Sequence, residues 1–352
     1  FIDSLIPKYG QAFHTEKPNI NQFDYVACNL WPALIITYQI KTVLYRYTNT
    51  SPTDWNGIPS NEKDRIQNLL NQPNNLIWPI QIACAQKLAT FFILDKKFAR
   101  ECIMPLFHDE STRHQTWAAF LAFPRITSSF SEEDVSNLLE DQIAEARNLC
   151  EYKDQGLRNN YWDVLFNFMN MQSNTSNTYD AVLKTVLYNS GFSTLSEIAK
   201  FLPYWCRQQN DEQIDIAWKN WLKTYITNRF QGIPRDLDSE EQKALICLVP
   251  SLRGHISEAL EILSTTDNTS IDFSQDHYPV PEGYDEKEQQ QLLLFYQWKV
   301  KHQTGECDST LLRWWLHRIL RNLTDEYPDL DLTALRETMQ DQFGFTGIAG
   351  ID

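Results

Sequence analysis

The chain has 352 residues, a formal net charge of −15 and a hydrophobic fraction of 42%. That length allows one large domain or two ordinary domains, and the composition excludes a disordered chain. The negative charge repels a phosphate backbone, so nucleic acid is an unlikely global partner and we expect a protein partner.

The most apolar stretch, residues 33–43, is too short to cross a bilayer and contains polar residues, so we expect no membrane span. The seven cysteines are scattered and form no C-x-x-C pair. We therefore expect reduced, buried thiols in a cytoplasmic protein, with no disulfide, zinc site or other cofactor. Because the chain begins at Phe1, we expect it to be part of a longer protein.

Helical periodicity dominates the chain. Ser131 is the expected N-cap of a helix, and Asp134 occupies the position of a capping-box acid. Apolar residues then recur at steps of three and four, at Val135, Leu138, Leu139, Ile143, Ala146 and Leu149. Such patterns predict an all-α fold of roughly fourteen helices joined by short loops. We expect an irregular α-solenoid of stacked antiparallel helix pairs.

Two longer loops interrupt the pattern, near residues 46–63 and 264–288. The second is rich in turn-forming residues, which predicts a separate terminal unit after it. We therefore expect an N-terminal helical region at 1–155, a central helical region at 156–265, a long loop at 266–285 and a C-terminal helical unit at 286–352.

The segment "LFHDESTRH" gathers His108, Asp109, Glu110 and His114. The two histidines are six residues apart, whereas the usual helical zinc motif places them four apart on one face. We interpret the segment as a charged corner between helices, in which Asp109 or Ser111 caps the next helix. Paired carboxylates elsewhere stand at helix N-termini, where the helix dipole favours them, so we assign no catalytic residue.

Residues 218–242, "WKNWLKTYITNRFQGIPRDLDSEEQ", predict a corner between two helices. The first helix ends near Phe230, and Asp238 begins the next. Trp218, Trp221 (or Leu222) and Tyr225 share the buried face, with Trp218 expected against the helix after Pro234. Arg229 is expected in the last turn of the first helix, where a cation interacts favourably with the negative end of the helix dipole. Gly232 can adopt a positive φ, and Pro234 prevents the helix from continuing. The residues with structural roles are Trp218, Trp221, Tyr225, Arg229, Gly232 and Pro234.

A local basic stripe lies in "LLRWWLHRILRN". Arg313, His317 and Arg321 recur every four residues, and Arg318 lies beside them. The stripe is a candidate binding surface for an acidic partner, a phosphate or a nucleic acid strand. The alternative is a solvated face whose arginines pair with neighbouring carboxylates. Trp314 and Trp315 point about 100° apart, so one is expected in the core and the other partly exposed.

The corner and the helix that follows it carry a family resemblance. Paired tryptophans, an arginine, "GIP", an acidic cap and "LICLVPSL" resemble the helical domain of unknown function 4020, over about residues 160–345. "TWAAFLAFPRITSSF" is similar to the upstream helical segment of the same architectures. That family occurs toward the C-terminus of large bacterial and archaeal proteins. Some members carry an N-terminal sirtuin-like or other effector module and are associated with antiviral defence. The resemblance implies no catalytic residues here.

The leading functional hypothesis is a non-catalytic helical sensor or scaffold module. It would bind a protein trigger, such as a phage component, and regulate an effector domain in cis that is absent from this chain. The competing hypothesis is an all-α enzyme whose active-site residues are dispersed in sequence. A weaker alternative is nucleic-acid binding through the Arg313 stripe.

Overall fold

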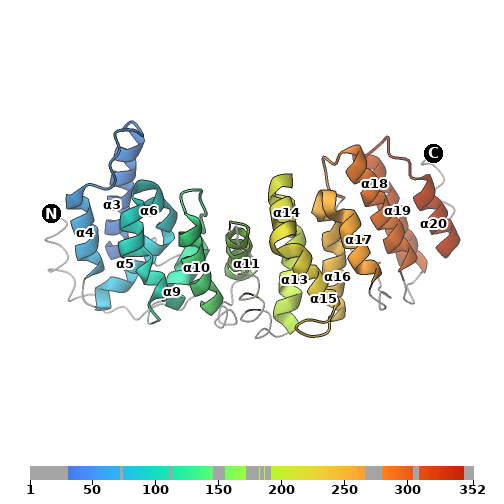
Figure 1. Ribbon diagram of the computed structural model, residues 1–352, viewed down its shortest axis with the longest axis horizontal. Coiled ribbons are helices and arrows are strands. Elements are labelled where there is room, and N and C mark those ends of the chain that lie inside the picture. Colours follow the sequence, from blue (N-terminus) through green and yellow to red (C-terminus); the bar gives the residue numbers. More distant parts are fainter. Residues whose placement is uncertain are drawn as a thin grey trace. The chain divides into compact units, whose positions relative to one another are not determined.

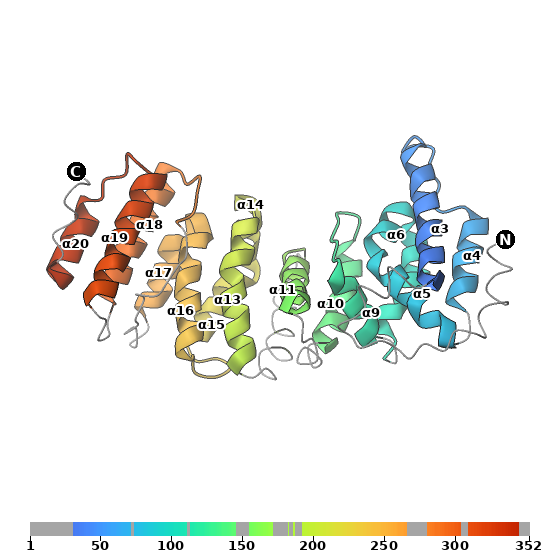
Figure 2. The same ribbon diagram turned by 180° about the vertical axis from the view of Figure 1, so that it is seen from behind.

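The computed structural model describes residues 31–71, 74–110, 113–145, 155–171, 192–265, 280–303 and 309–344, together with Val182 and Val186 (Figures 1 and 2). Within these ranges the regular elements are helices and no β-strand is present, which confirms the predicted all-α class. The chain divides into two compact units, residues 1–189 and 190–352. The arrangement of helices as a solenoid stays a prediction.

The first unit contains a run of helices of very different lengths. They are α3 (Trp31–Thr48), α4 (Ser60–Leu70), α5 (Asn74–Gln86), α6 (Leu88–Leu94), α7 (Lys96–Phe98), the π-helical turn η3 (Ala99–Ile103), α8 (Pro105–His108), α9 (Arg113–Ala122), α10 (Glu132–Glu145) and α11 (Gln155–Asn170). Helix α3 packs on α5, α5 on α9, and α9 on α11. The core is rich in aromatic rings, and the Phe107 ring meets Trp117 and Phe120 edge to face at 5.1 and 5.8 Å.

Helix α10 begins as its sequence predicts. The Ser131 N–H donates to Asp134 Oδ2 at 2.9 Å, and the Asp134 N–H donates to Ser131 Oγ at 3.3 Å, which completes a capping box. The predicted apolar face is buried at Val135, Leu138, Leu139 and Ile143. Its last two members, Ala146 and Leu149, lie outside the described residues.

The second unit contains longer helices and two irregular turns. They are α13 (Phe192–Gln208), α14 (Asp211–Ala217), the π-helical turn η6 (Trp218–Leu222), α15 (Lys223–Phe230), α16 (Ser239–Leu248), the 3₁₀-helical segment η7 (Val249–His255), α17 (Ile256–Ser264), α18 (Glu286–Lys301), α19 (Ser309–Glu326) and α20 (Thr333–Phe343). Helix α13 packs on α16, and α18 packs on α17, η7 and α20. Helices α17 to α20 appear in chain order across this unit in both views (Figures 1 and 2).

The division into units differs from the domain boundaries expected from the sequence. Helix α11 begins at the expected boundary near residue 155, yet it belongs to the first unit because it packs on α9 and α10. The expected C-terminal unit at 286–352 forms one compact unit with the central region, because α18 packs on η7 and α17. Of the expected loop at 266–285, only residues 280–285 are described.

Among the described residues, no helix is long and apolar enough to cross a membrane. Cys84, Cys206 and Cys247 are buried, as predicted, whereas Cys102 is half-buried. Burial raises the pKa of the Cys84 and Cys206 thiols, so both stay protonated at neutral pH.

Candidate binding site on helices α18 and α19

Helix α19 turns one side toward its unit and the other toward solvent. Its inner side buries Trp315, Leu316, Ile319, Leu320 and Leu323. Trp315 is only 2% exposed, whereas its neighbour Trp314 is 50% exposed. The prediction that one tryptophan of the pair is in the core and the other exposed is therefore confirmed, and it follows from the turn of about 100° between successive residues.

The residues of the predicted basic stripe have different surroundings. Arg313 and Arg321 are exposed, and His317 and Arg318 are half-buried. Arg321 Nε lies 3.5 Å from the Asp325 carboxylate one turn later, an exposed pair of the kind that contributes little to stability. For Arg321 the structure thus shows the alternative arrangement, in which an arginine pairs with a carboxylate of its own helix.

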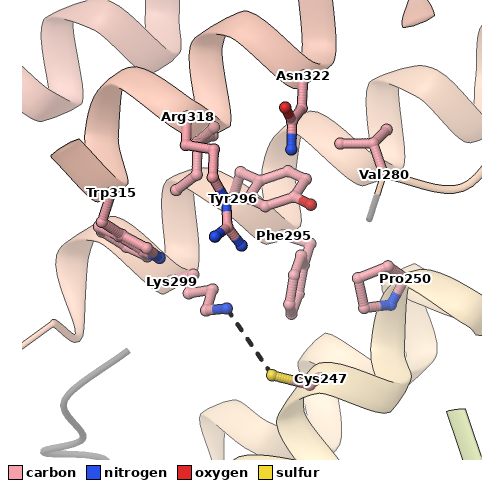
Figure 3. Close-up of a pocket in the computed structure, with 10 residues that line it drawn as sticks. Cys247, Pro250, Val280, Phe295, Tyr296, Lys299, Trp315, Arg318 and Asn322 are labelled. Carbon is pink, nitrogen blue, oxygen red and sulfur yellow. Dashed lines mark hydrogen bonds between the residues drawn. The ribbon is translucent and has the colours of Figure 1, made fainter. Parts of the chain in front are cut away.

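Arg318 makes the more informative contact. Its guanidinium carbon lies 5.0 Å from the centroid of the exposed Trp314 ring, within the range of a cation–π interaction. The side chain also lines a pocket between α18, α19 and the end of α16 (Figure 3). Arg318 therefore joins the exposed side of α19 to an interior cavity.

The pocket is a small cavity of about 20 Å³ with both polar and apolar lining residues. Of these, Cys247, Lys299 and Trp315 are buried, whereas Arg318 and Asn322 are half-buried. The remaining lining residues are Pro250, Val280, Phe295, Tyr296 and Ile319. The lining combines residues from four separate segments, and no aspartate or glutamate is among these described residues.

Lys299 is the least expected member of the lining. It is 5% exposed, although a lysine is seldom buried unless its ammonium has polar or aromatic contacts. Its Nζ donates to Cys247 Sγ at 3.8 Å and lies 5.8 Å from the centroid of the Trp315 ring (Figure 3).

Two tyrosines connect the segment that contributes Val280 to the pocket with η7 through hydrogen bonds. The Tyr284 hydroxyl donates to the Pro250 carbonyl oxygen, and the Tyr284 N–H donates to the Tyr327 hydroxyl at 3.3 Å. Tyr327 in turn donates to the Pro281 carbonyl oxygen at 2.5 Å. Burial raises the pKa of Tyr284, which keeps its hydroxyl protonated and able to donate. These bonds tie residues 280–284 to the 3₁₀ segment and to the end of α19.

The helix that carries Lys299 also begins in a defined way. Asp285 and Glu288 form a complete capping box at the start of α18, with bonds of 2.8 and 3.1 Å. The cap sets the helix register, which places Leu292, Tyr296 and Lys299 on the buried side. This spacing of four and three residues places a lysine on an apolar helix face, and a lysine at such a position is the feature of the sequence that could have indicated Lys299. No comparable signal marks Cys247 or Asn322.

The tryptophan corner of the second unit is a packed helix junction. Helix α15 ends at Phe230, Asp238 caps α16, and Gly232 has a φ of 75°, all as predicted. The peptide bond before Pro234 is cis. Trp218, Trp221, Leu222 and Tyr225 are buried, and the Trp221 ring lies 5.7 Å from that of Trp205 on α13.

The structure adds partners at this corner that the sequence did not indicate. Trp218 is buried, as predicted, and it stacks on His255 at 5.1 Å while its Nε1 donates to Glu258 at 3.2 Å. Arg229 lies in the last turn of α15, as predicted. It is fully buried because Glu241 on α16 accepts from its Nε at 2.6 Å and from its Nη2 at 2.9 Å.

The charged corner of the first unit joins α8 and α9 to α10. His108 Nδ1 contacts the Asp141 carboxylate, and His114 Nδ1 contacts the buried carboxylate of Glu145. Burial raises the pKa of Asp141, although His108 and Arg113 lower it in part. Among the described residues, no group of three or more histidines, cysteines or carboxylates could hold a metal ion.

Comparison with family models, with curated proteins and with solved structures finds no match for this chain. The resemblance to the helical domain of unknown function 4020 therefore stays a prediction that rests on the residues quoted for it.

Proposed function

We propose that this chain is a non-catalytic recognition module that binds an acidic segment of a protein partner through the exposed side of α19. The observation that carries the proposal is the half-exposed Trp314, with Arg318 at 5.0 Å from its ring and Arg313 exposed on the same helix. Tryptophan and arginine are the residues most enriched among those that dominate protein interfaces.

Charge supports the same assignment. The chain carries −15 overall, so a cationic surface on α19 differs from the average surface of the molecule. Such a surface attracts an acidic partner and increases the association rate in a salt-dependent way. A long nucleic acid would be repelled by the rest of the chain, which makes nucleic-acid binding the weaker alternative.

On the strength of the family resemblance, we further propose a setting for this recognition. The chain would be the C-terminal part of a larger prokaryotic defence protein, the acidic partner would be a phage component, and binding would regulate an effector domain in cis. The region from α18 to α20 would be the sensing part of such a protein.

Site-specific photo-crosslinking tests the proposal. A photoreactive phenylalanine analogue replaces Trp314 in the full-length protein, and cells are irradiated with and without phage challenge. The matched control replaces Tyr204, which is also half-exposed and lies on α13 of the same unit. We expect one discrete crosslinked protein from position 314, none from position 204, and loss of that product with Arg313→Glu. The same products from both positions would contradict the proposal.

A second candidate function is an all-α enzyme, and one observation favours it. The His108 ring is 45% exposed and contacts Asp141, as a general base oriented by a carboxylate would. Replacing His108 with glutamine separates the two functions. It would abolish turnover by an enzyme that uses this histidine, whereas crosslinking from position 314 would be unchanged.

A further inference from the structure

We propose that the outer side of helix α3 is a second interaction surface, which binds an amphipathic helix of a partner protein with one acidic residue in its apolar stripe. This surface belongs to the first unit, so the inference goes beyond the function proposed for α19. Three observations carry it: α3 is apolar on two opposite sides, its exposed residues have the spacing of a helix–helix seam, and one lysine interrupts them.

The first observation concerns the two sides of α3. The helix packs on α4, α5 and α6, and it buries Ile36 and Ile40 on that inner side. Residues two positions apart lie about 200° from each other around a helix, so the outer side carries other residues. These include Leu34, Tyr38 and Tyr45, which are 48%, 65% and 71% exposed. Because a surface helix normally turns polar residues to water, this outer side has the composition of a face that packs against another element.

The second observation concerns spacing. Four exposed residues follow one another at steps of four, three and four, and they form the α3 stripe: Leu34, Tyr38, Lys41 and Tyr45. These are the steps between the a and d positions of a heptad, along which one helix packs against another. The stripe is about 16 Å long, which matches about three turns of a partner helix. In both views the last turns of α3 extend past the neighbouring helices of their unit, so this end of the helix is accessible (Figures 1 and 2).

The third observation concerns charge, and it selects the partner. Helix α3 contains no aspartate or glutamate, and Lys41 is the charged residue of the α3 stripe. Arg46, the other cation of the helix, lies 3.4 Å from the Glu62 carboxylate. A helix packed along the stripe would remove the Lys41 ammonium from water, which is costly unless a carboxylate lies opposite it. The partner helix is therefore expected to carry an aspartate or glutamate at that position.

The same lysine disfavours two other occupants of the α3 stripe. A second copy of α3 packed on the stripe would bring two Lys41 ammonium groups close together in either orientation, and like charges repel each other. An anionic membrane surface would be repelled by the net charge of −15, and insertion of the stripe would bury the lysine together with the tyrosines.

Two synthetic peptides of about three heptads test the proposal, each with leucine at the a and d positions except for one central d position. That position is glutamate in the first peptide and lysine in the second. Binding of each labelled peptide to the full chain is followed by fluorescence anisotropy. We expect the glutamate peptide to bind at least about tenfold more tightly than the lysine peptide, and Lys41→Glu to reverse this preference.

Matched variants separate a local effect from a general one. Lys97→Glu reverses the charge of an exposed lysine elsewhere in the same unit and should leave the preference between the peptides unchanged. Tyr45→Ala removes an exposed ring and leaves the core intact, so we expect it to weaken binding of the glutamate peptide by about tenfold. Tyr204→Ala, at a similarly exposed position on α13, should not change that affinity.

Three results would overturn the proposal. The first is that wild type binds the two peptides equally or binds neither. The second is a dimer in sedimentation velocity that Tyr45→Ala dissociates, which would assign the α3 stripe to a second copy of the chain. The third is flotation of the chain with anionic phospholipid vesicles that Tyr38→Ala abolishes, which would assign the stripe to a lipid surface. All three leave the α19 proposal standing, because α19 belongs to the other unit.

Discussion

Each unit contains a helix junction in which an arginine donates hydrogen bonds to a carboxylate near the start of a later helix. In the first unit, Arg100 donates to the two oxygens of Asp134 at 2.6 and 2.8 Å. In the second unit, Arg229 donates to the two oxygens of Glu241 at 2.6 and 2.9 Å. In both cases the carboxylate stands three residues after the N-cap, Ser131 or Asp238.

The two junctions differ in burial and in the origin of their other bonds. The Arg100 side chain is 44% exposed, whereas Arg229 and Glu241 are fully buried. Arg100 also donates to the Ser131 hydroxyl at 3.1 Å, and Arg229 instead donates to the carbonyl oxygens of Ile233 and Arg235 in the turn. An arginine–carboxylate pair therefore stabilises a helix cap in the first unit, whereas a pair of the same kind is buried inside a corner between two helices in the second unit.

The largest expected effect is at the buried pair. Replacing Arg229 with methionine leaves the Glu241 carboxylate buried without its partner, so we expect a loss of about 3–5 kcal/mol. Hydrogen exchange read by mass spectrometry on α16 peptides measures the opening of this unit separately from the other, which a single unfolding curve would not. The double variant Arg229→Met with Glu241→Leu should recover much of the loss, because no buried charge remains. A double variant as unstable as the single one would contradict this account.

The next effect is expected at Gly232, which shapes the turn beneath Arg229. Its φ of 75° is unfavourable for other residues, and an added Cβ would lie 2.9 Å from the Asp236 carboxylate. Asp236 is exposed and can move, so the backbone accounts for most of the expected cost, about 1–2 kcal/mol for Gly232→Ala. Denaturant midpoints of this variant and of Gly254→Ala, at a site with open space and an ordinary φ, provide the comparison. Equal midpoints would show that the turn does not constrain the corner.

A smaller effect is expected in the first unit. Arg100→Met removes a half-exposed cation from Asp134, which keeps its bonds from Ser131. Asp134 is only 2% exposed, but truncation of the 44% exposed Arg100 side chain opens its carboxylate to water. We therefore expect a loss of about 1 kcal/mol, well below that of Arg229→Met. Exchange rates of α10 peptides measure it. Equal losses of stability in the two units would mean that the burial of the ion pair does not determine how much it contributes.

The smallest effect is the acid dependence of the first junction. Burial alone would raise the pKa of Asp134, but the bonds from Arg100 and Ser131 outweigh it and lower the pKa from 3.8. Because the pKa is lower in the folded state, the charged carboxylate contributes stability that is fully present above pH 3.8 and is lost as the pH falls through the folded pKa. The difference in α10 exchange between wild type and Asp134→Asn should therefore shrink below pH 3.8. A difference that stays constant there would contradict the assignment.

Features set by neighbouring residues were predictable. The capping box of Ser131 and Asp134, the end of α15 at Phe230 and the positive φ of Gly232 were all expected and confirmed. Each depends on residues within one or two helical turns. The ring partner of Trp218 and the burial of Arg229 were not predicted, because both depend on partners at His255, Glu258 and Glu241.

The sequence alone therefore determined the helical class, the capped helix starts and the inward and outward sides of α19, since helix periodicity and capping are local. Only the tertiary structure decided that Lys299 and Arg318 line one cavity with Cys247, and that Arg229 and Glu241 form a buried pair. Those arrangements bring together residues from different helices. The distance between such side chains depends on how whole helices pack, and no spacing along one chain encodes it.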